Sequence, residues 1–149
     1  MEQKSAFESF ELDVNEDIRS FLKETSKWTS FISIIGFVGI GLMVIGGILV
    51  GFFSGLSEIP ENTAYGVGYS AGVGMFYLII ALVYFFPILY LFKFSKKMKS
   101  ALALNNNEDF KMAFLNLKSH YKFMGIFIIV IITLYILIFI GAIVSASIF

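Results

Sequence analysis

The chain has 149 residues, of which 58% are hydrophobic and 15% are charged, whereas a soluble domain of this size is about half apolar and a quarter charged. It contains no cysteine, which excludes disulfides, zinc–thiolate sites and a cysteine nucleophile. The 11 basic and 11 acidic residues give a net charge of zero, so the distribution of charge carries the information and its sum does not.

Residues 1–27 are predicted to form a cytoplasmic, acidic N-terminal segment with a short amphipathic helix. Asn15 is a suitable N-cap for this helix, which would lead into the first apolar stretch. Its apolar face would carry Ile18, Phe21, Leu22, Thr25 and Trp28. We interpret the apolar residues before Asn15 as part of a frayed terminus. The alternative is a short segment that orders on a partner or across the basic residues that follow the second span.

Three stretches without any charged residue follow, and each is predicted to hold a transmembrane helix. They are Trp28–Ser57, Asn62–Phe92 and Phe123–Phe149, and a membrane-spanning helix needs only about 20 apolar residues. We therefore expect an all-α integral membrane protein. Its transmembrane helices would be residues 28–56, 64–92 and 123–149, with an external loop at 57–63.

The basic residues predict the orientation of the chain. All 11 of them lie either before residue 28 or within residues 93–122, which places them on one side of a three-span protein. Because Lys and Arg are enriched in cytoplasmic loops, we expect a cytoplasmic N-terminus and an external C-terminus.

Residues 93–122 are predicted to form a lysine-rich cytoplasmic hairpin of two amphipathic helices. Three asparagines, Asn105–Asn107, supply a turn and an N-cap between the helices. The second helix carries an apolar stripe, whose candidate docking residues for lipid or a partner are Phe110, Phe114 and Leu117. The two helices would pack on each other or, alternatively, lie flat in the headgroup layer with their lysines outward.

Four lysines open this hairpin: Lys93, Lys96, Lys97 and Lys99. Their simplest interpretation is a topology signal beside the second span. The alternative is a docking surface for anionic lipid headgroups or for a partner protein. The sequence leaves both interpretations open.

Small residues recur four apart within the three spans, a spacing that lets helix backbones approach closely in lipid. The candidate helix-packing positions are Gly47, Gly51, Gly55, Gly66, Gly68, Ser70, Gly72, Gly74, Gly141 and Ser145. We expect these rows to pack the three helices against one another. The alternative is that one row is a seam for a second subunit.

Residues typical of chemistry are sparse. The spans hold no Asp, Glu, Lys, Arg or His, which argues against a pump or a proton-coupled transporter. Pro87 is expected to kink the second span, and His120, the only histidine, is interpreted as an ordinary interfacial residue. Because no nucleophile–base pair, metal-ligand cluster or phosphate-binding loop is evident, we expect no enzyme activity, no cofactor and no metal.

Three blocks of the sequence resemble a known family. They are "KWTSFISIIGFVGIGLM", "YFFPILYLFKFSKKMKSAL" and "FKMAFLNLKSHYKFMGI", and they resemble small multi-pass inner-membrane proteins of Bacteroidota that carry an unknown-function label. The resemblance covers residues 13–137. It implies a bacterial cytoplasmic membrane and a helical fold, and it transfers no catalytic residue.

Two functions from different classes fit these observations. The favoured one is a non-catalytic accessory or scaffolding subunit of a larger inner-membrane complex, with anionic lipids and other membrane subunits as partners and no nucleic acid. The alternative is a homo-oligomeric channel or permeation component. In that case the polar wall would come from Tyr65, Tyr69, Ser70, Tyr77 and Tyr84.

Overall fold

The computed structural model describes residues 16–56 and 64–148, which form three long α-helices. Helix α1 spans Glu16–Leu56, α2 spans Ala64–Leu104 and α3 spans Asn107–Ile148. Each has 41 or 42 residues and is therefore about 60 Å long. The predicted external loop, the residues before Glu16 and Phe149 lie outside the described residues.

All three helices are long and apolar enough to cross a membrane. The prediction of an all-helical chain with three such segments is therefore confirmed. Each helix is about twice as long as the ~30 Å hydrocarbon core of a bilayer. Much of the excess length lies in the charged part of each helix, which is confined to one end.

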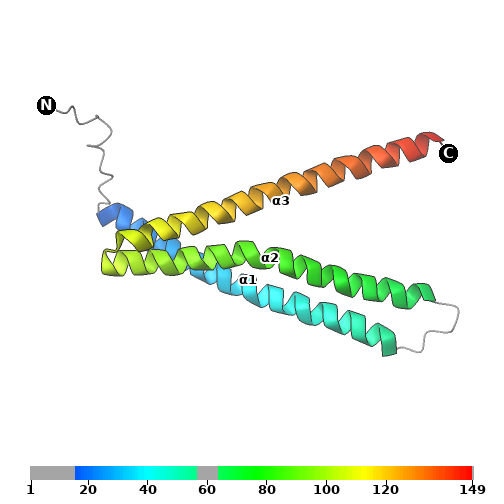
Figure 1. Ribbon diagram of the computed structural model, residues 1–149, viewed down its shortest axis with the longest axis horizontal. Helices are drawn as coiled ribbons and strands as arrows, with labels where there is room; N and C mark the ends of the chain where they lie inside the picture. Colours follow the sequence, from blue (N-terminus) through cyan, green and yellow to red (C-terminus); the bar gives the residue numbers. More distant parts are fainter. Residues whose placement is uncertain (1–15, 57–63, 149) are drawn as a thin grey trace.

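The charged residues gather where the three helices converge. We call this region the basic end and define it as residues 16–28 of α1, 93–104 of α2 and 107–122 of α3. Figure 1 shows α1 and α2 side by side along their length, whereas α3 diverges from them as it leaves the basic end. Helix α2 packs against both neighbours, and α1 and α3 have no close backbone contact among the described residues.

The helices pass through the expected domain borders without a break. Helix α2 is continuous from its uncharged part through Lys93 to Leu104, and α3 is continuous through Lys122 into its uncharged part. No Gly or Pro stands at either join, so nothing in the backbone interrupts the helical hydrogen bonds there. The segment 93–122 is thus formed by the ends of two long helices and the turn between them.

The turn between α2 and α3 is built from asparagines. Asn105 has a φ of 48°, the left-handed conformation that Asn tolerates better than most residues. The Asn106 amide donates to the Ala101 carbonyl at 3.1 Å, which closes α2 in the manner of a Schellman motif. The Asn106 side-chain oxygen then accepts from the amides of Glu108 at 2.9 Å and Asp109 at 3.2 Å. The predicted asparagine turn and N-cap are confirmed.

A small apolar core lies inside the basic end. Phe94 and Met98 of α2 and Ala113 of α3 are buried. Leu22 of α1 packs against the same cluster, together with Leu102, Phe110 and Leu117. The ends of α2 and α3 at the turn therefore pack on each other and on α1, with their apolar faces inward.

Candidate functional site

The four lysines of the α2 segment do not form one patch. All four are exposed, but Lys97 faces α3, where it pairs with Asp109 at 2.7 Å. Lys99 lines a hollow with residues of α1, and Lys96 lies 4.7 Å from the centre of the Phe92 ring. Helical rotation therefore turns Lys97 toward α3 and Lys99 toward α1.

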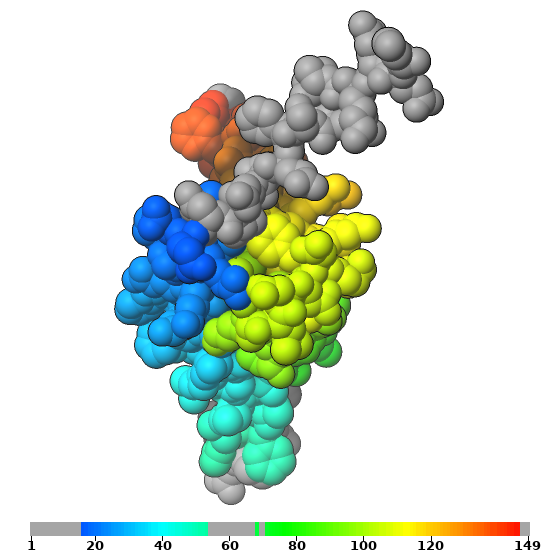
Figure 2. Space-filling view, turned by 90° about the vertical axis from the view of Figure 1, so that its left-hand side faces the viewer, coloured from blue at the N-terminus to red at the C-terminus, as the bar shows by residue number. Residues whose placement is uncertain are grey.

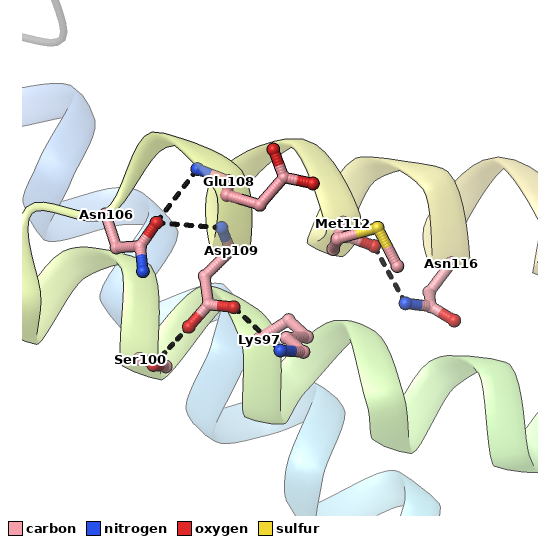
Figure 3. Close-up of polar contacts among 7 residues, drawn as sticks. All are labelled: Lys97, Ser100, Asn106, Glu108, Asp109, Met112 and Asn116. Carbon is pink, nitrogen blue, oxygen red and sulfur yellow. Dashed lines mark hydrogen bonds and ion pairs between the residues drawn. The ribbon is translucent and has the colours of Figure 1, made fainter.

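The pair of Lys97 and Asp109 belongs to a network that fixes the hairpin. Figure 3 shows Asp109 between α2 and α3, where one carboxylate oxygen accepts from Lys97 and the other from Ser100, at 2.7 and 2.5 Å. The hydrogen bond from Lys97, followed by that from Ser100, lowers the pKa of the Asp109 carboxyl below its ordinary value of 3.8. At neutral pH the carboxylate therefore stays ionised and holds the two helices in register.

The three apolar docking candidates of α3 take part in internal packing. Phe110 and Leu117 are partly buried against the Phe94 cluster. The Phe114 ring packs edge-on against Phe110 at 5.0 Å and Phe94 at 6.4 Å, yet 43% of Phe114 remains exposed. Of the three, Phe114 alone is exposed, whereas Phe110 and Leu117 are half-buried.

The glycine rows meet at one point between α1 and α2. A Cβ atom added to Gly74 would lie 2.7 Å from the Gly47 carbonyl oxygen and 3.2 Å from the Gly51 amide nitrogen. A Cβ atom on Gly47 would in turn lie 3.0 Å from the Gly74 carbonyl oxygen. Backbone touches backbone here, which only glycine permits.

At four other glycines the direction in which a side chain would point is open. A Cβ atom on Gly51, Gly68, Gly72 or Gly141 would meet no described atom within 4 Å. Ser145 is exposed near the end of α3. The side-chain positions of the remaining three candidates lie outside the described residues: Gly55, Gly66 and Ser70.

Pro87 lies inside α2 and has a partner that the sequence does not predict. Because proline has no N–H, it leaves one turn of the helix without a backbone hydrogen bond. His120 of α3 approaches the same turn, and its Nδ1 lies 2.8 Å from the Pro87 carbonyl oxygen. Since a carbonyl only accepts, Nδ1 donates. His120 thus ties α3 to the interrupted part of α2.

The main seam between α1 and α2 follows a seven-residue spacing that the sequence analysis missed. The buried residues of α1 along this seam include Ser26, Ser33 and Gly47, and those of α2 include Gly74, Ala81 and Ser95. The Ser95 hydroxyl donates to the Ser26 carbonyl at 2.8 Å. Small residues seven apart are the signal that would have found this seam, because that period keeps one face toward a supercoiled neighbour.

The fold and these contacts define a class: an all-helical protein with three helices long and apolar enough to cross a membrane, joined at a polar end. The chain belongs to the family described as Family of unknown function (DUF5362), whose model matches residues 67–143. No curated protein and no solved structure matches the chain significantly. Membership of a family without an assigned function is confirmed. The first of the three resembling blocks, residues 27–43, lies outside the match.

Proposed function

We propose that the protein is a non-catalytic interaction protein of the bacterial cytoplasmic membrane, an accessory or scaffolding subunit of a larger assembly. The N-terminus and the basic end would face the cytoplasm, and the C-terminus would face outward. The distribution of basic residues supports this orientation, since all 11 are confined to the N-terminal segment and residues 93–122.

The observation that carries this proposal is the uncovered outer part of α3. The ring contacts between α2 and α3 extend from Phe94 and Phe114 to Tyr84 and Phe127, whose rings lie 5.7 Å apart. Beyond them, the large apolar side chains from Ile128 to Ile140 are 49 to 71% exposed on every side of the helix, Ile131 alone being partly covered. Gly141 and Ser145 follow four apart, a spacing suited to another membrane helix.

The positions of the ionisable groups support a non-catalytic role. Asp109 is engaged with Lys97 and Ser100, Arg19 donates to the Leu102 carbonyl and His120 is bound to Pro87. These groups cap or join helices. Two of the tyrosines that a channel would need also take part in packing, since Tyr84 contacts Phe127 and the Tyr77 Cβ lies beside Gly47.

Purification in a mild detergent or in native nanodiscs tests the proposal. We expect other membrane subunits to copurify in fixed proportion. A Gly141→Leu/Ser145→Leu variant should lose them, whereas the matched variant Ile138→Leu should keep them. A discrete homo-oligomer without other subunits would instead favour the channel, and retention of every subunit by the double variant would exclude α3 as the docking helix.

A further inference from the structure

A hollow between α1 and α2 at the basic end is lined by four basic side chains. Its volume is about 450 Å³, and its charged lining residues are Arg19, Lys23, Lys27 and Lys99. The remaining lining residues, Ser26, Leu102 and Ala103, carry no charge. Figure 2 looks onto this end, with the first turns of α1 beside the hairpin of α2 and α3.

The charges in this hollow repel one another. Arg19, Lys23 and Lys27 stand four apart on α1, a spacing that places like charges side by side on one helix face and destabilises it. Lys99 adds a fourth charge from α2. No ion pair joins any of the four to an acid among the described residues. A bound anion would relieve this repulsion.

One of the four bases is held in place by the fold. A guanidinium nitrogen of Arg19 donates to the Leu102 carbonyl at the end of α2, so this side chain is positioned before any ligand arrives. A guanidinium carries five N–H donors in a fixed fork, and the other donors remain for an anion. The hollow therefore combines a fixed guanidinium with three flexible ammonium groups, a combination suited to phosphate oxygens.

A second hollow continues from the first toward the apolar part of α1. It measures about 690 Å³ and shares Lys23 and Lys27 with the first, and it ends at Trp28 and Phe31. These two rings pack edge-on at 6.1 Å and are 59% and 54% exposed. Trp is enriched where a helix passes through the headgroup layer. The single acid along this path, Glu24, lines the second hollow and not the first.

We infer that the hollow formed by Arg19, Lys23, Lys27 and Lys99 binds the phosphate headgroup of one anionic phospholipid, whose apolar part lies along Trp28 and Phe31. A water-soluble phosphate fits the four bases alone, but it leaves the aromatic continuation without an occupant. Basic pockets between membrane helices on the cytoplasmic side are known to hold anionic headgroups. This inference rests on the proposed membrane location and on no partner subunit.

Native mass spectrometry tests the inference. The full chain is mixed with defined lipids in detergent, and the lipids that it retains after release from the detergent are counted. The probes are phosphatidylglycerol and cardiolipin, compared with zwitterionic phosphatidylethanolamine. The test variant is Lys23→Gln/Lys27→Gln/Lys99→Gln, which leaves Arg19 and its contact with Leu102 intact. The control, Lys111→Gln/Lys118→Gln/Lys122→Gln, removes as much charge from exposed positions of α3.

The wild type is expected to retain one anionic lipid in preference to phosphatidylethanolamine. The test variant should bind it roughly tenfold more weakly or worse, because each basic residue near a membrane surface contributes substantially to anionic lipid binding. The control should change this affinity less than threefold. Trp28→Ala should weaken lipid binding without changing the weak binding of glycerol phosphate.

Three results would overturn the inference. They are equal retention of anionic and zwitterionic lipid by the wild type, equal losses in the two triple variants, and competition by glycerol phosphate as strong as that by the lipid. The last result would assign the hollow to a soluble phosphate. Carbonate extraction measures membrane insertion separately. A protein that does not insert would refute the proposed membrane location, whereas a protein that inserts but shows one of these three results would refute only the lipid site.

Discussion

A single methyl group at Gly74 should separate α1 from α2. Alanine at this position would place its Cβ 2.7 Å from the Gly47 carbonyl oxygen, whereas ordinary contacts begin near 3.4 Å. The two backbones would therefore have to move apart by about 0.7 Å. No side chain can rotate out of the way, because the nearest neighbours are backbone atoms of Gly47 and Gly51.

The expected cost follows from two opposing terms. Overpacking of this kind typically costs about 1–3 kcal/mol. Alanine also favours a helix over glycine by roughly 0.8–1 kcal/mol in water, and this gain would mask part of the cost. Gly72→Ala removes the ambiguity, because it makes the same exchange two residues away where the new Cβ meets no described atom within 4 Å. The difference between the two variants isolates the steric term.

The assay is unfolding of the variants in mixed micelles by a denaturing detergent. The loss of helix is followed by circular dichroism. We expect Gly74→Ala to be less stable than Gly72→Ala by about 1–3 kcal/mol, and Gly47→Ala to fall between them because its closest contact is longer, at 3.0 Å. Equal stability of the Gly72 and Gly74 variants would refute the close crossing of α1 and α2.

Three further outcomes are expected. Asn105→Gly should preserve or raise the thermal unfolding midpoint in detergent. Asn105→Val should lower the stability by about 1–2 kcal/mol, since a side chain branched at Cβ is costly at the observed φ of 48°. Equal midpoints of the two variants would show that the turn does not depend on this conformation. Asp109→Asn should lower stability at neutral pH. Because the pKa of Asp109 is lowered, its carboxylate contributes fully to the stability above pH 3.8, and this contribution is lost as the pH falls further. The stabilities of the wild type and the variant should therefore converge in acid, and a difference that stays constant with pH would contradict this account. Because the chain has no cysteine, single cysteines at Ser57 and Ser100 test the topology in intact cells: an impermeant thiol reagent should label position 57 and spare position 100, and the opposite pattern would reverse the proposed orientation.

The sequence predicts the three long apolar helices and the asparagine turn because both depend on local signals. An uncharged run of 27 or more residues has few stable alternatives to a membrane helix. The cap of Asn106 depends on amides two and three residues ahead. Such features require no knowledge of which helices are neighbours.

The contacts between helices were less accessible to sequence reasoning. Spacing by four predicts a shared helix face but not the direction of that face, so it does not tell Gly74, which touches α1, from Gly72, which does not. The outer part of α3 is apolar on every side, and a helix without a polar stripe gives no indication of how it is rotated or where it leaves a neighbour. The sequence likewise does not show which helix each lysine faces. Lys97 points to α3 and Lys99, only two residues later, points to α1.

The divergence of α3 has a mechanical consequence. The helix is attached to α2 through its first half, and the segment from Phe127 to Ile148 extends beyond the last ring contact. This segment is a lever about 32 Å long, so a rotation of only about 5° at its base displaces its tip by about 3 Å. The His120–Pro87 hydrogen bond lies just before this base, at the one turn of α2 where proline has already removed a backbone restraint. A small change in charge or packing at the basic end would thereby become a lateral displacement of the opposite end of α3.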